Sequence, residues 1–197
     1  PMPVLDPGRG QTKRGQFWSH AVDDRPWGGP APPAVAYVYA EGRSMADLAS
    51  QVHGFTGILQ VDGYGSYKGL ARRHPRIQLA FCLAHARRKF VAVYKATHAP
   101  LARDVIASLG EVYAIEARIR GLSAAERRAI RQAETKPIME ALKARLMTAL
   151  AEVPSRSSLV EAFKYMLGHW AGLTLFLEDG RIEVDTNTVE RTMRPIA

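Results

Sequence analysis

One acidic side chain stands where a buried strand would end. Asp62 follows the short apolar run 57–61 and precedes Gly63. A carboxylate at the end of a rigid strand has a fixed direction, and hard cations such as Mg²⁺ prefer carboxylate oxygens. The Asp-Gly pair also favours a turn in which the Asp side chain binds its own backbone. The local sequence favours this turn over a metal ligand, so two interpretations of Asp62 stay open.

A second acid, Glu190, lies near the end of the chain. If Asn187 caps a helix there, Glu190 falls at the third helical position and would close a capping box. Alternatively, Glu190 is a metal ligand on the first turn of that helix. Arg191 and Arg194 would then face one side of the helix and could hold phosphates. The local pattern does not favour either interpretation.

A cysteine and a histidine are separated by two residues, at Cys82 and His85. Such a pair can share a metal, but zinc takes four ligands and Cys82 is the only cysteine. We therefore interpret Cys82 as a buried strand residue. His85 could face a phosphate, with Arg88 and Lys89 one helical turn onward. The usual alternative for a run such as Arg87-Arg88-Lys89 is a solvated helix face.

The elements that would position these residues change in kind along the chain. Up to Cys82 the pattern is strand-like, with short β-branched and aromatic runs between Gly and Pro. One helical segment, 44–52, interrupts them. The runs that we expect to be strands are 16–22, 34–40, 57–61 and 77–82.

From Ala84 to about Leu177 the apolar residues recur at helical spacing. Ser123-Ala124-Ala125-Glu126 is a capping box, so a helix should begin there. Lys136-Pro137 should interrupt that helix. A short extended segment at 181–184 and a final helix after Asp185 are expected next. The whole order predicts an α/β protein with a mixed sheet, flanking helices and helices inserted late.

Composition narrows the class of protein. The 197 residues are 47% hydrophobic, which suits one folded domain or one domain with an insertion. No apolar run approaches the roughly 18 residues of a membrane span. The formal net charge of +8 makes nucleic acid the first candidate partner. A single cysteine fits a reducing cytoplasm.

Several blocks, in order, resemble the transposases of the insertion-sequence-66 family. They cover essentially the whole chain, and ordered blocks are far more specific than one motif. The blocks are 3–10, 23–30, 54–64, 82–90 and 176–182, followed by Asn187, Glu190-Arg191 and 194–197.

The resemblance implies a ribonuclease-H-like catalytic core with an Asp, Asp, Glu metal triad. It makes Asp62 the second Asp and Glu190 the Glu, with Mg²⁺ or Mn²⁺ as cofactor. The core would comprise 1–97 and 178–197, and 98–177 would be a helical insertion. The residues expected to contact DNA are His85, Arg87, Arg88, Lys89, Asn187, Arg191 and Arg194.

The chain departs from the family pattern at the first Asp. In the family that Asp lies in an Asp-Glu-Thr-Pro string, and Pro1 resembles the proline of the string. Asp6 lies too far along to replace it. We therefore expect a fragment that is inactive alone.

The implied reaction is cleavage and transfer of DNA strands, in which two metal ions activate the attacking hydroxyl and stabilise the leaving oxygen. The expected partners are transposon ends, target DNA and further copies of the full-length protein, in the bacterial cytoplasm at the nucleoid, with no membrane. One rival is a non-catalytic basic helical module that binds nucleic acid, and another is a nuclease of the same fold. The metal mechanism requires the Asp62 and Glu190 carboxylates within roughly 4–8 Å of each other.

Overall fold

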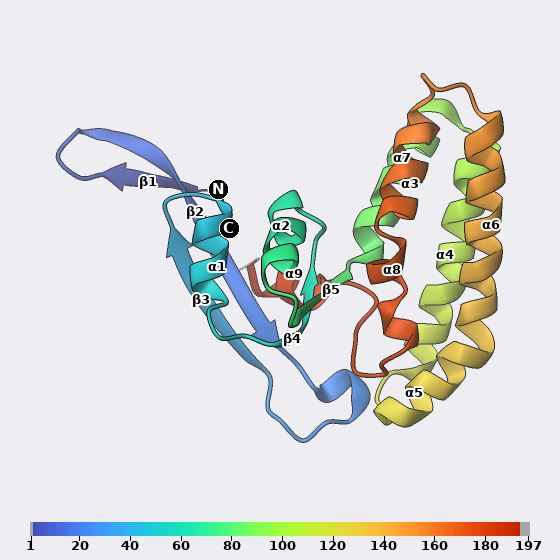
Figure 1. Ribbon diagram of the computed structural model, residues 1–197, viewed down its shortest axis with the longest axis horizontal. Helices are drawn as coiled ribbons and strands as arrows, with labels where there is room; N and C mark the ends of the chain where they lie inside the picture. The colour runs from blue at the N-terminus through green and yellow to red at the C-terminus, as the bar shows by residue number, and fades with distance from the viewer. Residues whose placement is uncertain (1, 194–197) are drawn as a thin grey trace.

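The computed structural model describes residues 2–193, which form a mixed α/β structure with two small sheets (Figure 1). The first sheet is an antiparallel meander, and the second is a parallel pair. We expected one mixed sheet, but β4 pairs only with β5 among the described residues, so the two sheets stay separate. The strands are β1 (Met2–Asp6), β2 (Gln11–Val22), β3 (Ala34–Ala40), β4 (Gly57–Val61) and β5 (Ile77–Phe81).

Strand β2 is longer than the run 16–22 that its composition predicts. Its first half pairs with β1, from Met2↔Gly15 to Asp6↔Gln11, and its second half pairs with β3. The extra length comes from the β1–β2 hairpin, which projects from the body of the molecule (Figure 1). Its turn uses Gly8 and Gly10 at φ of 78° and 61°.

Two short helices pack beside the strands. They are α1 (Met45–Gln51) and α2 (Gly65–Arg73). Ser44 caps α1 through a complete capping box with Asp47, which explains why the helix begins there. Leu48 and Leu70 then form a small core with Ile77 of β5, and Trp18 of β2 packs against it.

The middle of the chain forms a helical lobe, at the right in Figure 1. Ser123 caps α5 with Glu126, as predicted. The expected break at Lys136-Pro137 is wrong, because the helix continues through a π turn, Arg131–Thr135, which leads into α6 with Pro137 in its first turn. The α-helices of the lobe are α3 (Leu83–Thr97), α4 (Pro100–Ile119), α5 (Ala124–Ile130), α6 (Lys136–Glu152), α7 (Ser158–Gly168) and α8 (Trp170–Leu173).

One hydrophobic core joins the lobe to the parallel strands. Phe90, Leu109 and Phe163 are fully buried in it, and Val61 and Phe81 from the ends of β4 and β5 belong to the same cluster. The ends of these strands are therefore held rigidly against helices. The division of the chain into a catalytic core, 1–97 and 178–197, and a helical insertion, 98–177, stays a prediction.

After the lobe, the chain returns toward the strands. Residues 181–184, expected to be extended, form turns and bends instead. The final helix, α9 (Asn187–Met193), lies beside β2, where Ser19 Oγ and Thr192 Oγ1 are 2.8 Å apart. Within residues 2–193, no helix is long and apolar enough to cross a membrane.

Candidate active site

Asp62 lies at the carboxyl end of β4, where the preceding Val61 is only 4% exposed and the carboxylate itself is exposed. Its Oδ1 accepts a hydrogen bond of 2.9 Å from the backbone N–H of Tyr64. The turn predicted for Asp-Gly is therefore present. It uses one carboxylate oxygen and fixes the side chain, and Oδ2 accepts no hydrogen bond from the described residues.

The helical lobe contacts the backbone of Asp62 through Tyr165 of α7. Its hydroxyl donates to the backbone oxygen of Asp62 at 3.4 Å. The same hydroxyl would lie 2.6 Å from a Cβ on Gly63, whose φ is 92°. The left-handed backbone therefore favours glycine at this position, and a Cβ would in addition displace the Tyr165 hydroxyl. Burial, followed by the nearby charge of Asp62, raises the pKa of Tyr165.

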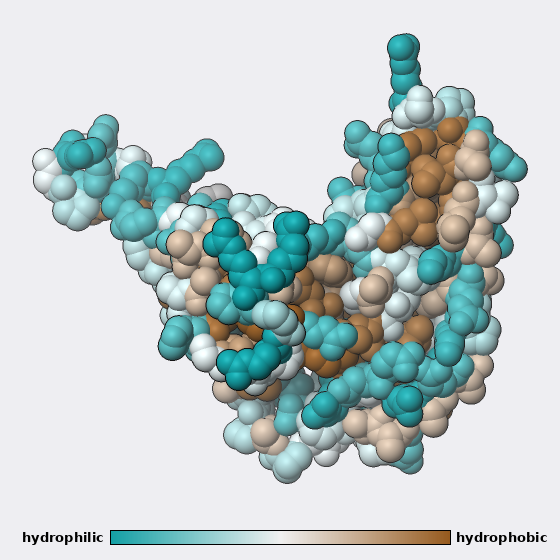
Figure 2. Space-filling view, viewed as in Figure 1, coloured by the Kyte–Doolittle hydropathy of each residue, from teal (hydrophilic) through white to brown (hydrophobic). Residues whose placement is uncertain are grey.

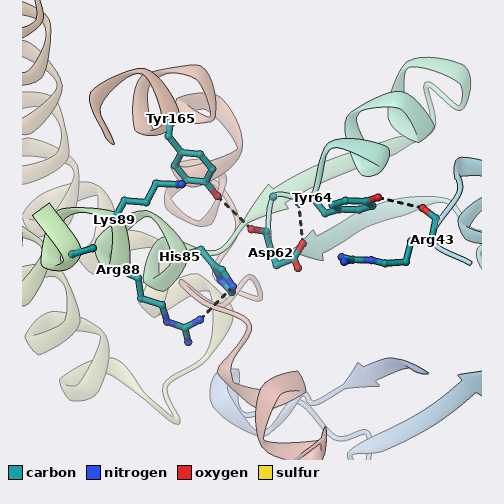
Figure 3. Close-up of a pocket in the computed structure, with 9 residues that line it drawn as sticks. Arg43, Asp62, Tyr64, His85, Arg88, Lys89 and Tyr165 are labelled. Atoms are coloured by element: carbon teal, nitrogen blue, oxygen red, sulfur yellow. Dashed lines mark hydrogen bonds between the residues drawn. The ribbon is translucent and has the colours of Figure 1, made fainter. Parts of the chain in front are cut away.

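A pocket of about 470 Å³ opens beside Asp62 (Figure 3). Its charged lining consists of one carboxylate, Asp62, and the cations Arg43, Arg88 and Lys89. Two of these cations lie over aromatic rings, with Arg43 4.3 Å from the centre of Tyr64 and Lys89 Nζ 4.5 Å from the centre of Tyr165. The excess of cations favours a ligand with several negative charges. In Figure 2 the surface is hollowed between the strand-bearing part and the helical lobe.

Glu190 lies at the same group of basic residues. Arg88 Nη2 donates to Glu190 Oε2 at 2.7 Å, and His85 Nε2 is 3.8 Å from Oε1. The capping-box interpretation of Glu190 is wrong, because its side chain reaches α3 instead of the start of α9. Asp185 takes that role, accepting from the backbone N–H of Asn187 at 2.9 Å and from Asn187 Nδ2 at 2.7 Å.

The two candidate acids therefore share neighbours. Asp62 lines one pocket with His85 and Arg88, and Glu190 is bonded to Arg88. Within residues 2–193, no group of three or more His, Cys, Asp or Glu side chains is placed to hold a metal ion. The separation of 4–8 Å that we expect for the two carboxylates stays a prediction.

The other expected DNA contacts divide into two groups. His85, Arg88 and Lys89 line the pocket. Arg87 does not line it, the Asn187 amide is occupied by Asp185, and Arg191 is exposed with its guanidinium 3.3 Å from Thr188 Oγ1. Arg194 lies outside the described residues.

Cys82 contacts residues on both sides of the site, Thr186 before α9 and His85 in α3. It is buried, and its sulfur accepts from the backbone N–H of Thr186 at 3.3 Å. Burial acts to raise the pKa of the Cys82 thiol, but the contacts with His85 and Thr186 lower it overall. The same contact with Cys82 is the main reason that the pKa of His85 is raised. Cys82 therefore joins α3 to the approach to α9 and favours a protonated His85.

Comparison with known proteins identifies the family. A model described as "Transposase IS66 family" matches residues 1–197. The chain belongs to the IS66 transposase family. This agrees with the resemblance carried by the blocks around Asp62, His85 and Glu190.

Three relatives, all from Sinorhizobium fredii (strain NBRC 101917 / NGR234), illustrate the extent of the match. Uncharacterized protein y4jD is 52% identical over 201 residues, which are all of this chain and 39% of the relative. Uncharacterized proteins y4qI and y4hP are 41% and 35% identical, over 98% and 96% of this chain and 37% of each relative. The IS66-family chain thus spans well under half the length of these relatives. No solved structure matches it.

Proposed function

We propose that this chain is the catalytic segment of a DDE-type DNA transposase, which cuts and joins DNA strands by metal-dependent phosphoryl transfer. The observation that carries the proposal is the placement of Asp62 and Glu190 beside the same two side chains, His85 and Arg88. The two acids are 128 positions apart in the sequence, so the fold alone brings them to a common neighbourhood. Membership of the IS66 transposase family supports the reaction class.

The chemistry of the donor atoms suits a hard divalent cation. Asp62 Oδ2 accepts no hydrogen bond among the described residues, and Glu190 Oε1 is buried without a hydrogen-bond partner there. These two oxygens would hold Mg²⁺ or Mn²⁺. When bound, such ions activate an attacking hydroxyl and stabilise the leaving oxygen. The proposed fold of this site is a ribonuclease-H-like core with the helical lobe as an insertion.

The chain's own cations would orient the DNA. Arg43, Arg88 and Lys89 face the pocket and would neutralise phosphates next to the scissile bond. Arg88 has a second role, because it offsets the charge of Glu190 before DNA arrives. Tyr165 and the Asx turn to Tyr64 hold Asp62 in place.

The first test replaces the acids in a full-length family member that contains this chain. Asp62→Asn and Glu190→Gln should each reduce strand cleavage beyond the ~10–100-fold that follows loss of a group behind a metal ligand. DNA affinity should stay within a few-fold. Asp104→Asn serves as the matched control, because the half-exposed Asp104 pairs with its neighbour Arg103 and does not line the pocket. Cleavage that survives both substitutions, with DNA still bound, would favour the rival non-catalytic module.

A second test uses residues 1–197 alone. Because the described residues supply only two candidate carboxylates, we expect weak Mn²⁺ binding and no nicking of plasmid DNA with Mg²⁺ or Mn²⁺. Mn²⁺ binding, followed by its electron paramagnetic resonance signal, should fall further in Asp62→Asn. Nicking by the purified chain would contradict the proposal that a third carboxylate is needed.

A further inference from the structure

Side chains of the helical lobe are hydrogen-bonded to the backbone of the segment that leads into α9. We define the return segment as residues 176–186. The Arg131 guanidinium donates to the backbone oxygens of Phe176 and Asp179 at 2.9 and 3.2 Å. Arg128 Nε donates to the Glu178 oxygen at 2.9 Å, as Gln132 Nε2 does to the Leu177 oxygen at 2.8 Å. Helix α5 and the π turn thus hold the first half of the return segment by its backbone.

Arg131 also belongs to a buried cluster of charged side chains. Arg131 and Arg127 are 0% and 1% exposed, and Glu116 of α4 is 9% exposed. Glu116 accepts two hydrogen bonds from Arg131, at 2.8 and 2.7 Å, and a longer one from Arg127 at 3.4 Å. One carboxylate cannot balance two buried guanidinium groups. The second carboxylate is Glu183 of the return segment. Its Oε1 accepts from Arg127 Nη2, and its Oε2 accepts from the exposed Arg120 at 3.1 Å.

The second half of the return segment is fastened to the strands. Gln60 Nε2 of β4 donates to the Glu183 backbone oxygen, two residues before Asp62. The Leu83 N–H donates to the Val184 oxygen at 2.8 Å, two residues before His85. The bond from Thr186 N–H to Cys82 Sγ completes the attachment. Glu183 is therefore bonded to the lobe by its side chain and to β4 by its backbone.

We propose that Glu183 is a positioning residue, and that its ion pair with Arg127 sets where α9 and Glu190 lie relative to Asp62. The side chains of Arg127 and Glu183 are 2% and 23% exposed, so the pair acts through the return segment and not through direct contact with DNA. The placement of α9 is a property of the fold. Its consequence for cleavage rests on the proposed function.

The test measures geometry directly in the 197-residue chain. Nitroxide labels at Gly65→Cys and Arg191→Cys report the distance between two sites. One is at the start of α2, three residues after Asp62, and the other is in α9. Both sites are exposed, and a Cβ at Gly65 meets nothing within 4 Å. In Glu183→Gln we expect the double electron–electron resonance distance distribution to broaden or to shift by about 1–2 Å, the scale of helix shifts at packed interfaces. Glu178→Gln, which also faces an arginine but is exposed, should leave the distribution unchanged.

An unchanged distribution in folded Glu183→Gln overturns the proposal. If that variant does not fold, Glu183→Asp decides, because it keeps every charge and the bond from Gln60 but draws the carboxylate back from Arg127 by one methylene. The same broadening or shift is expected for this second variant, and an unchanged distance distribution in it would also overturn the proposal.

The consequence for DNA cleavage is measured in a full-length family member that contains this chain. There, Glu183→Gln should lower the rate of the cleavage step by ~10–100-fold, as for other groups behind a metal ligand, with DNA affinity within twofold. Because the distances are measured without DNA or metal, they stand even if Asp62→Asn and Glu190→Gln leave cleavage intact. That result would remove the proposed function and leave the positioning role.

Discussion

The chain contains two clusters of opposite charges that differ in their access to water. In the helical lobe, Arg127, Arg131 and Glu116 are at least 91% buried, and Glu183 completes their charge balance. At the pocket, Arg88 and Glu190 are 56% and 37% exposed in their side chains, and the cations outnumber the acids. Buried charges must be paired to be tolerated, whereas exposed ones can exchange partners.

This difference suits the lobe cluster to a structural role and the pocket to the binding role that we propose. In the lobe cluster both buried guanidinium groups are paired with carboxylates, and these pairs hold the return segment. The pocket has uncompensated positive charge, an acid with one free oxygen and a salt bridge that water can replace. A polyanion with bound cations could replace the internal partners of the pocket at little cost.

The largest effect is expected where the buried cluster is broken. Arg131→Met should lower the free energy of unfolding by roughly 3–5 kcal/mol, because it leaves Glu116 buried with one long hydrogen bond. Urea denaturation followed by circular dichroism measures the loss. Arg118→Met removes an ion pair whose side chains are 58% and 46% exposed, and it should cost ~1 kcal/mol or less. Equal losses in the two variants would abolish the distinction between the clusters.

A smaller effect is expected where the lobe touches the pocket. Gly63→Ala should lower the free energy of unfolding by ~1–3 kcal/mol, since its φ is 92° and its Cβ would meet the Tyr165 hydroxyl at 2.6 Å. Gly65→Ala is the matched control. It lies at the start of α2 with open space around it, so alanine should be neutral or stabilise by up to ~1 kcal/mol. Thermal and urea unfolding of both variants provide the comparison, and a harmless Gly63→Ala would contradict the close contact.

Much of the local structure could be predicted from the sequence. The predicted cap at Ser123 depends on hydrogen bonds within four residues, so its whole cause lies in the local sequence. The capping box at Ser44 has an equally local cause, although only the helix after it was predicted. Strands β3 and β4 match the predicted runs because alternation and flanking glycines act locally. The pairing of strands depends on contacts across the chain, and there the expectation of one mixed sheet was wrong.

The site could be predicted only in part. Asp62 and Glu190 emerged from ordered family blocks, and the structure gives them common neighbours. Tyr165 was missed because an aromatic residue at helical spacing looks like core, and Arg43 because a lone arginine in a loop carries no pattern. Glu190 was open to a capping interpretation because the sequence cannot show that the backbone N–H of Asn187 is bonded to Asp185 instead.

The smallest effect is expected at the exposed cations, and it tests the binding role most directly. Lys89→Ala in the 197-residue chain should weaken binding of a random-sequence duplex. It should also reduce the slope of log affinity against log salt by about 1, because one phosphate contact is lost. Lys143→Ala is the control, since Lys143 also lies over an aromatic ring, Trp170 at 5.9 Å, but on α6 away from the pocket. Fluorescence anisotropy at several salt concentrations gives both slopes. If the two lysines change the slope equally, DNA binds the helical lobe as readily as the pocket, and the excess charge beside Asp62 has no special function.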